Sequence, residues 1–336
     1  MNRRVSVVVP CRNEANAISA CVTAIARSTY PDLEIIVVDG MSEDQTRLIL
    51  SELAQHYPQL KVVDNPHRLT PYAFNLGIIN STGAFVQIVG SRNILAPDYL
   101  EKMVEALEAH PEAACVGGDY QHVFDTPASR HISMAMESKF GVGASNYRTM
   151  NNSCFVDTVG VPMYRREIFN EIGLFDERLT RNQDDDFNYR VTRAGHRIYY
   201  CHEARTTYLV RGSYRKLFRQ MMQYGYFKVL VNKKHRAVTT ARQLVPPLFV
   251  LFLAGGLPLL QFPWAFRWGY AAVLITYLGL GFFAAWSRAG GMVETLGTQW
   301  AIATMHFGYG IGYLRGIADF IILGRQPSRS MQAQTT

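Results

Sequence analysis

The chain has few cysteines, and they form no recognisable pattern. There are five in 336 residues, an odd number, scattered at positions 11, 21, 115, 154 and 201. This argues against a small disulfide-stapled fold and against a zinc site built from paired cysteines, and it is typical of a protein kept in a reducing compartment. We expect free thiols.

The N-terminus also lacks the pattern of an export signal. Two arginines lead directly into a short β-branched stretch, VSVVVP, without a long apolar segment followed by a cleavage site. We therefore expect the part of the chain before the first long apolar segment to stay in the cytoplasm. There is no internal repeat, and no low-complexity segment precedes the polar end, PSRSMQAQTT.

Charge is missing from two long stretches near the C-terminus, residues 244–262 and 269–286. Each is about as long as a helix must be to cross a hydrocarbon core of roughly 30 Å. We interpret both as membrane segments, the first kinked or re-entrant, rather than as buried helices of a soluble domain, where their prolines and glycines would fit poorly. A third, mixed segment at 298–323 is either a third span or an interfacial helix, in which Arg315 and Asp319 share a face and can pair.

The formal net charge is +7, and a basic run precedes the first apolar segment. Such a cluster beside a membrane span marks the cytoplasmic side and attracts anionic lipid head groups. No nucleic-acid-binding module accompanies the charge, so we expect no nucleic-acid partner. The run consists of Arg211, Arg215, Lys216, Arg219, Lys228, Lys233, Lys234, His235, Arg236 and Arg242.

The first part of the chain alternates short apolar runs with amphipathic ones. VSVVVP, LEIIVVDG and LKVVDN have the pattern of buried strands, and the segments between them have helical apolar spacing, the second with Ser42 as its N-cap. This order predicts an α/β fold with a parallel sheet covered on both faces. Ligands bind such sheets at the carboxyl ends of the strands, here residues 10–14, 39–42 and 90–93.

Two acidic segments stand out, a single aspartate at 39 and three aspartates at 184–186. Asp39, followed by Gly40, ends the second strand, where a carboxylate can bind a ribose hydroxyl or a base N–H, although the same pair is common in ordinary turns. Asp184, Asp185 and Asp186 open a predicted helix, where acids suit the helix dipole. Three adjacent carboxylates also repel one another and raise the proton affinity of at least one, which suits a general base. Both interpretations of each position stay open.

Five segments, in order, carry a resemblance: VSVVVPCRNEA, IIVVDGMSEDQT, NLGIINSTGAFV, YRREIFNEIGLFDERL and NQDDDFNYRVTRAGHRIYY. The chain resembles the family 2 glycosyltransferases and is most similar to the succinoglycan-type exopolysaccharide glucosyltransferases. The resemblance implies a GT-A (Rossmann-like) nucleotide-sugar domain at 1–230. After it we expect a basic juxtamembrane linker at 231–243, C-terminal membrane helices at 244–324 and a polar tail at 325–336.

The site residues that the resemblance implies can be carried over by position. Asp184 matches the base that deprotonates the acceptor hydroxyl, and Gly160, Asp185 and Asp186 match positions around the acceptor pocket. Gln220 falls where processive synthases carry Gln-x-x-Arg-Trp; because Gln223 and Tyr224 replace the Arg and Trp, we do not expect a processive polymerase. The implied nucleotide-sugar-binding residues are Pro10, Arg12, Glu14, Asp39, Gly40, Ser91 and Arg92.

The chain departs from the family at the Asp-x-Asp that normally binds Mg²⁺ or Mn²⁺ and, through it, the donor diphosphate. Those positions fall on Gly90 and Arg92, and the next acid, Asp98, is too far along to substitute. The Arg92 guanidinium carries a fixed charge and donors that fit phosphate oxygens, and Ser91 and Asn93 add further donors.

Three interpretations of this departure stay open. Arg92 replaces the ion in an active enzyme, or other acids such as Asp39 or Asp185 hold an ion, or the chain is a non-catalytic nucleotide-sugar sensor or scaffold in a glycan assembly complex. For an active enzyme the resemblance implies inverting transfer from a nucleotide-sugar, first a UDP-sugar, to a lipid-linked or polysaccharide acceptor. The place we expect is the inner (cytoplasmic) membrane, with the catalytic domain in the cytoplasm.

Overall fold

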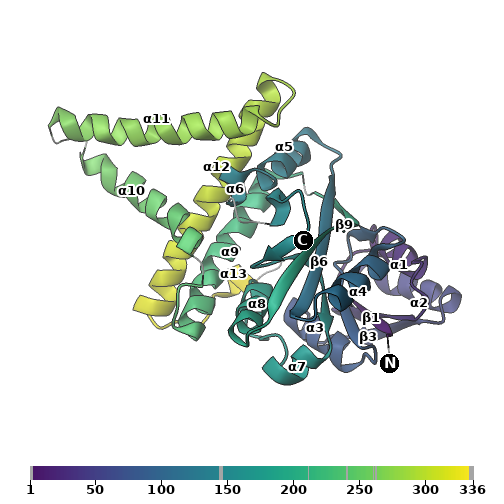
Figure 1. The fold of residues 1–336 in the computed structure, drawn as a ribbon. Coiled ribbons are helices and arrows are strands. Elements are labelled where there is room, and N and C mark those ends of the chain that lie inside the picture. The colour runs from purple at the N-terminus through teal and green to yellow at the C-terminus, as the bar shows by residue number, and fades with distance from the viewer. Residues whose placement is uncertain are drawn as a thin grey trace. The chain divides into compact units, whose positions relative to one another are not determined.

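The computed structural model describes residues 3–143, 147–210, 212–239, 241–259, 261 and 263–332. The chain divides into two compact units (Figure 1). Unit 1 comprises Met1–Val123 and Asn146–Leu209, and unit 2 comprises Phe124–Ser145 and Val210–Thr336. These units divide after Leu209 and place a short internal segment with the C-terminal helices, whereas the sequence-based domain boundary after residue 230 stays a prediction.

Unit 1 is built on one mixed sheet with the strand order β3-β2-β1-β4-β8-β6-β9-β5, and β7 pairs with β9. The strands are β1 Val5–Cys11, β2 Leu33–Asp39, β3 Leu60–Asp64, β4 Phe85–Ile88, β5 Asn93–Leu95, β6 Ala113–Val123, β7 Cys154–Val156, β8 Gly160–Arg165 and β9 Arg197–Leu209. The helices are α1 Ile18–Ala26, α2 Thr46–His56, α3 Thr70–Ile79, α4 Tyr99–Ala109, the 3₁₀ helix η1 Tyr147–Thr149, α7 Glu167–Ile172 and α8 Gln183–Arg193.

The predicted parallel arrangement is right for the first four strands in the chain. β3, β2, β1 and β4 are neighbours and parallel, with Val8 of β1 opposite Ile36 of β2 and Ile88 of β4. Beyond them the sheet is mixed: β6 and β9 are parallel, whereas β8 runs antiparallel to β4 and β6, and β5 and β7 run antiparallel to β9, where the prediction is wrong. An apolar run marks a buried strand, but it does not encode the direction of that strand.

The sheet of unit 1 is covered on both faces, as the continuous apolar strands predict. Val7 and Val9 of β1 pack into one hydrophobic cluster with residues of α1 and α4, whereas Val8 packs into a second cluster with residues of α3 and α8. This alternation follows from the two-residue period of a strand. Because both faces are covered, the polar groups of the sheet that a ligand can reach lie at its edges and at the ends of its strands.

Unit 2 is helical. Its elements are α5 Pro127–Met136, α6 Lys139–Val142, α9 Tyr214–His235, the 3₁₀ helix η2 Ala241–Leu244, α10 Val245–Leu259, α11 Trp264–Trp286, α12 Met292–Gly316, the π-helix η3 Ile317–Ile322 and α13 Arg329–Gln332. α9 packs closely along α12: a Cβ atom on Gly312 would overlap the Met222 carbonyl, so the two backbones are in contact. The predicted pair of Arg315 and Asp319 is confirmed, with 3.8 Å between Nε and Oδ2.

Two segments of unit 2 differ from their predicted descriptions. The basic linker is largely helical, because α9 continues to His235 and η2 begins at Ala241. The described part of the polar tail packs against α9: Met331 is 2% exposed, and its carbonyl accepts a hydrogen bond of 2.9 Å from Gln223 Nε2.

α11 is the one helix in the described residues that is long and apolar enough to cross a membrane, with 23 residues and a mean hydropathy of 1.5. At 1.5 Å per residue it is about 34 Å long. α10 has 15 residues, or about 22 Å, which is short of a hydrocarbon core of roughly 30 Å. The first predicted span is therefore not one straight membrane-crossing helix, and the number of spans stays a prediction.

Candidate active site

The carboxyl ends of β1, β2 and β4 lie at the same edge of the unit 1 sheet. Cys11 at the end of β1 is opposite Asp39 at the end of β2, and the Gly40 N–H donates to the Cys11 carbonyl at 2.7 Å. The Val89 N–H, just after β4, donates to the Val8 carbonyl at 3.0 Å. The segments that sequence reasoning singled out at 10–14, 39–42 and 90–93 therefore lie together, and Pro10 is the penultimate residue of β1.

The turns that follow β1 and β2 are tied to each other by side-chain hydrogen bonds. The Asn13 N–H donates to Ser42 Oγ at 2.9 Å, and the Glu14 N–H donates to Thr46 Oγ1 at 2.9 Å. The Glu43 N–H in turn donates to Asn13 Oδ1 at 2.8 Å. Asn13 has a φ of 52°, a left-handed conformation that asparagine tolerates better than most residues. The two turns thus form one connected rim beside the sheet.

Asp39 belongs to this rim rather than to an open surface. It is fully buried, and its carboxylate accepts hydrogen bonds from the N–H and the hydroxyl of Ser42 and lies 3.3 Å from the Arg47 guanidinium. Arg47 also pairs with Asp64 at 2.7 Å. The prediction of Ser42 as an N-cap is wrong, because α2 begins at Thr46 and Asp39 takes the Ser42 hydroxyl. A nucleoside contact by Asp39 stays a prediction.

Gly40 makes room for another side chain of the site. A Cβ atom at Gly40 would lie 3.2 Å from Arg12 Cβ and 3.3 Å from Arg12 Cδ, so the stem of Arg12 lies over this glycine. The Arg12 Nε is buried and has no hydrogen-bond partner among the described residues. Arg12 is therefore held at the β2 side of the end of β1, with donor capacity that the described protein does not use.

Arg92 lies at the other side of the end of β1. Its Nε donates to Glu14 Oε2 at 2.7 Å, and the two side chains are 31% and 15% exposed. The turn that carries Arg92 is closed by a hydrogen bond of 2.9 Å from the Asn93 N–H to the Gly90 carbonyl, and Ser91 is buried. A Cβ atom on Gly90 would lie 2.8 Å from Asn93 Oδ1, which is too close without a shift. The turn is thus built around a glycine where the family has its first aspartate.

The residues of this edge do not fit a resident divalent ion. The described part of the chain contains no group of three or more His, Cys, Asp or Glu side chains placed to hold one. The acids nearest to the turn are engaged, since Glu14 pairs with Arg92 and Asp39 binds Ser42 and Arg47. Asp185, the second acid that could replace the family's metal ligands, accepts a hydrogen bond of 2.6 Å from Asn182 Nδ2. Mg²⁺ and Mn²⁺ prefer several carboxylate or carbonyl oxygens, and this arrangement does not supply them.

The two thiols at this edge do not suit nucleophilic chemistry. Burial, with smaller effects of Asp39 and Glu14, raises the pKa of Cys11 far above its ordinary value. Burial likewise raises the pKa of Cys21 to about 12, and the Cys21 thiol donates weakly to the Gly90 carbonyl at 3.7 Å. A thiol reacts as its thiolate, so these cysteines act as packing groups near neutral pH.

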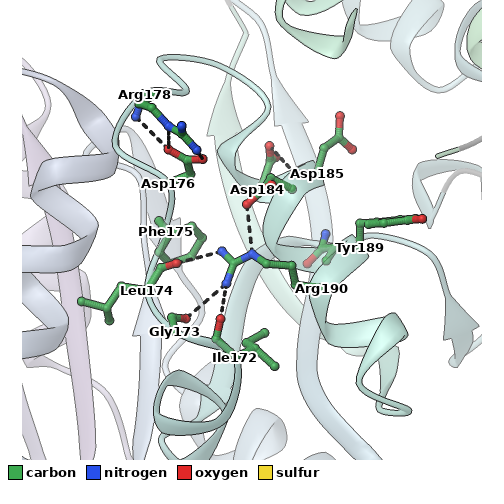
Figure 2. Close-up of polar contacts among 12 residues, drawn as sticks. Ile172, Gly173, Leu174, Phe175, Asp176, Arg178, Asp184, Asp185, Tyr189 and Arg190 are labelled. Atoms are coloured by element: carbon green, nitrogen blue, oxygen red, sulfur yellow. Dashed lines mark hydrogen bonds and ion pairs between the residues drawn. The ribbon is translucent and has the colours of Figure 1, made fainter. Parts of the chain in front are cut away.

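The acidic helix start lies in α8, whose first turn contains Asp184, Asp185 and Asp186. Figure 2 shows Asp184 and Asp185 at the beginning of this helix and Arg190 further along it. Asp184 is exposed and accepts a hydrogen bond of 2.9 Å from the Asp185 N–H, as acids at helix starts do. Burial raises the pKa of Tyr164 well above its ordinary value, and the negative charge of Asp184 is among the smaller causes of this shift.

Asp186 has a different environment from Asp184. It is fully buried and pairs with Arg190 at 3.1 Å. Arg190 also donates to the carbonyls of Ile172 at 2.6 Å and Leu174 at 2.8 Å, as Figure 2 shows. Through these carbonyl bonds Arg190 joins α8 to the end of α7 and the segment after it. Sequence reasoning missed Arg190, although its spacing of four residues from Asp186 on a predicted helix was a usable signal.

Gly160 is the first residue of β8 and is buried. A Cβ atom there would overlap the ring of Tyr120 and lie 2.6 Å from the Tyr147 hydroxyl. The glycine therefore permits the close approach of two tyrosines. Gln220, the remaining predicted pocket residue, is on α9 of unit 2, where its Nε2 donates to the Tyr224 hydroxyl at 3.1 Å.

Three comparisons with known proteins agree on the kind of protein this is. Residues 6–173, half of the chain, match the model of glycosyl transferase family 2. The succinoglycan biosynthesis protein ExoA of Rhizobium meliloti (strain 1021) is 29% identical over 320 residues, which cover 94% of this chain and 95% of that protein.

A second relative is named as a glucuronosyltransferase. The dolichyl N-acetyl-alpha-D-glucosaminyl phosphate 3-beta-D-2,3-diacetamido-2,3-dideoxy-beta-D-glucuronosyltransferase of Methanococcus voltae is 29% identical over 239 residues, covering 68% of this chain and 74% of that protein. Among solved structures, the mannosyltransferase PcManGT of Pyrobaculum calidifontis, in complex with GDP-Man and Mn²⁺, has a TM-score of 0.64 at 19% identity. That match covers 94% of this chain and 87% of that one, and it shows the fold.

The family resemblance read from the five ordered segments is confirmed, and so is the GT-A α/β fold. With half of its length matching the family model, the chain belongs to glycosyl transferase family 2 and is a glycosyltransferase.

Proposed function

We propose that the protein is a membrane-associated, inverting glycosyltransferase of exopolysaccharide or other cell-surface glycan synthesis. It moves a sugar from a nucleotide-sugar, with UDP-sugars as the first candidates, to a lipid-linked or polysaccharide acceptor. The observation that carries the proposal is the exposed carboxylate of Asp184 in the first turn of α8, in a chain of this family. The near full-length match to a succinoglycan biosynthesis protein supports the class of product.

The reaction is a single displacement. Asp184 accepts the proton of an acceptor hydroxyl as the hydroxyl oxygen attacks the anomeric carbon of the donor sugar. The bond between that carbon and the diphosphate oxygen breaks, and its electron pair leaves with the nucleoside diphosphate, so the anomeric configuration inverts. Asp184 then releases the proton to water.

The three acids of α8 differ in their fitness for the role of base. A base must come within hydrogen-bond reach of a hydroxyl brought by another molecule, which suits the exposed Asp184. Asp186 is fully buried against Arg190 and is committed to that pair, and Asp185 binds Asn182 Nδ2 at 2.6 Å. Asp185 and Asp186 then shape the helix start that presents Asp184.

Membrane association is supported by the surface of α11. Of its residues only Gly281 and Ala285 are buried, and large apolar side chains such as Ile275 and Phe283 are exposed. Exposed tryptophans lie at both ends of the helix, at positions 264 and 268 near its start and 286 at its end. Aromatic belts at the two ends of an apolar helix are typical of a helix that crosses a membrane.

The side of the membrane follows from charge. α9 ends in Lys233, Lys234 and His235, which precede the first apolar helix of unit 2. Positive residues next to apolar helices are retained on the cytoplasmic side. The catalytic domain would therefore face the cytoplasm at the inner membrane, where nucleotide-sugars and membrane-bound acceptors are both within reach.

The test is sugar transfer in membranes that contain the full chain. Labelled UDP- and GDP-sugars are supplied one at a time, and label is measured in the organic-solvent extract and in the polymer fraction. Loss of a general base typically lowers a rate about 10²- to 10⁴-fold, so Asp184→Asn should nearly abolish transfer. Glu105→Gln, which changes an exposed carboxylate on α4, is the matched control and should leave the rate unchanged.

Two other results of the transfer experiment would contradict the proposal. If Asp184→Asn transfers sugar as fast as the natural chain, Asp184 is not the base. If donor binds but no transfer occurs with any acceptor fraction, the protein is a nucleotide-sugar sensor or scaffold and the proposed reaction is wrong.

A further inference from the structure

The feature behind this inference is the pair of arginines that flank the end of β1. β1 lies between β2 and β4 in the sheet, with both neighbours parallel to it. Arg12 lies over Gly40, on the β2 side, and Arg92 follows β4 and reaches Glu14. The two arginines therefore lie on either side of the end of β1.

Arg92 is held so that only part of its donor set is used. Its Nε donates to Glu14 at 2.7 Å, and the structure gives its two terminal nitrogens no partner among the described residues. The guanidinium is partly exposed, at 31% of its side chain. Glu14 therefore fixes the direction of the guanidinium from one edge and leaves the terminal N–H groups for another molecule.

Arg12 shows the same property more strongly. Its Nε is buried without a hydrogen-bond partner in the described part of the chain, and no ion pair of its guanidinium is found there. A buried donor without a partner costs free energy, and a native structure usually pairs it with protein, water or a ligand. Two guanidinium groups with unused donors at the ligand-binding edge of an α/β sheet are suited to an anion with several oxygens.

We propose, on the basis of the function proposed above, that Arg92, held by Glu14 and assisted by Arg12, binds the donor diphosphate and takes the place of a divalent ion. The family resemblance put the metal-binding aspartates at Gly90 and Arg92, and the described residues at this edge do not fit a metal ion. The guanidinium supplies the positive charge at the position from which the ion would act. It stabilises the negative charge that develops on the diphosphate as the sugar leaves.

The glycine of the turn supports this substitution. Because a Cβ atom on Gly90 would lie 2.8 Å from Asn93 Oδ1, an aspartate at this position requires the Asn93 side chain to move. The same turn presents Arg92 to Glu14. The turn as it stands therefore places Asn93 next to Gly90 and Arg92 next to Glu14.

The test measures donor-product binding and not turnover. The full chain in nanodiscs is titrated by calorimetry with UDP, with GDP and with inorganic diphosphate, each in EDTA and again with Mn²⁺. We expect at least one nucleotide to bind in EDTA within about threefold of its affinity with Mn²⁺. Arg92→Ala should weaken that binding roughly 10- to 100-fold, the range for a hydrogen bond to a charged group.

Two further variants make the result specific. Arg92→Lys keeps the charge but loses the planar fork, so it should bind with intermediate affinity. Arg27→Ala removes an exposed arginine at the end of α1 and should bind as the natural chain does. Thermal unfolding of each variant shows whether the protein is folded. If Arg92→Ala is folded and does not bind while Arg92→Lys still binds, misfolding does not explain the loss.

The inference is overturned if binding is lost in EDTA and restored by Mn²⁺, if Arg92→Ala binds as tightly as the natural chain, or if none of the three probes binds. Its failure is separable from failure of the proposed function. Ion-dependent binding with Asp184-dependent transfer would refute the inference alone, whereas ion-free binding without any transfer would refute the proposed function alone.

Discussion

The buried pair of Asp186 and Arg190 makes the most quantitative prediction for the catalytic unit. Asp186 is fully buried, and Arg190 pairs with it at 3.1 Å. Arg190→Ala would leave a buried carboxylate without this partner and remove the donors to the Ile172 and Leu174 carbonyls. Removal of one member of a buried ion pair costs about 3–5 kcal/mol, because the remaining charge is not solvated.

The expected shift in the thermal midpoint follows from the size of unit 1. For domains of about 150–250 residues, 1 kcal/mol corresponds to roughly 2–4 °C, so Arg190→Ala should lower the midpoint by roughly 6–20 °C. Scanning fluorimetry of the full chain in detergent measures this shift. Transfer should also slow at temperatures where the variant is folded. α8 carries Asp184, and in the variant α8 is no longer joined by Arg190 to the end of α7.

Arg178→Ala is the matched control for this prediction. Arg178 pairs with Asp176 at 2.7 Å near the same helix, but its side chain is 77% exposed (Figure 2). The Asp176 side chain is 10% exposed whereas that of Asp186 is fully buried, so the carboxylate that Arg178→Ala leaves behind still reaches water, and this variant should lower the midpoint less than Arg190→Ala does. If Arg190→Ala is no less stable than Arg178→Ala, Arg190 does not stabilise the attachment of α8 to α7, and the interpretation is wrong.

Three further predictions concern other parts of the chain. Gly160→Ala should destabilise unit 1 by about 1–3 kcal/mol or more, because the new methyl group overlaps the Tyr120 ring; thermal unfolding measures it, and an unchanged midpoint would contradict the packing. Since burial raises the pKa of Cys21 to about 12, its thiol stays protonated at pH 9, and iodoacetamide should modify the more exposed Cys154 first, as peptide mass mapping would show. Brominated lipids should quench the fluorescence of the α11 tryptophans in nanodiscs; equal fluorescence in ordinary and brominated lipid would argue against a membrane location of α11.

The sequence was informative wherever a local pattern carries the information. VSVVVP and LEIIVVDG predicted β1 and β2 because parallel strands buried on both faces are continuously apolar. The rule that ligands bind at the carboxyl ends of such strands also predicted that Arg12, Asp39 and Arg92 lie at one edge of the sheet. The start of α8 was likewise predicted from its three acids.

What could not be predicted depends on contacts between distant residues. The pair of Glu14 and Arg92 joins positions 78 residues apart, and no periodicity or composition signals it. The burial of Asp39 is a second example: its neighbour Ser42 looked like a helix cap, and only the tertiary structure shows that the hydroxyl binds the carboxylate instead. The antiparallel strands β5, β7 and β8 were missed because strand direction is set by the path of the connections.

Two residues carry the proposed sugar transfer, Asp184 as the base and Arg92 in place of a metal ion. The most direct measurement is the rate of sugar transfer from UDP- and GDP-sugars by membranes containing the natural chain, before and after treatment with EDTA, with Asp184→Asn beside it. If both residues have these roles, transfer survives EDTA and is nearly abolished in Asp184→Asn. Transfer that stops in EDTA and returns with Mn²⁺, or that persists in Asp184→Asn, would contradict it.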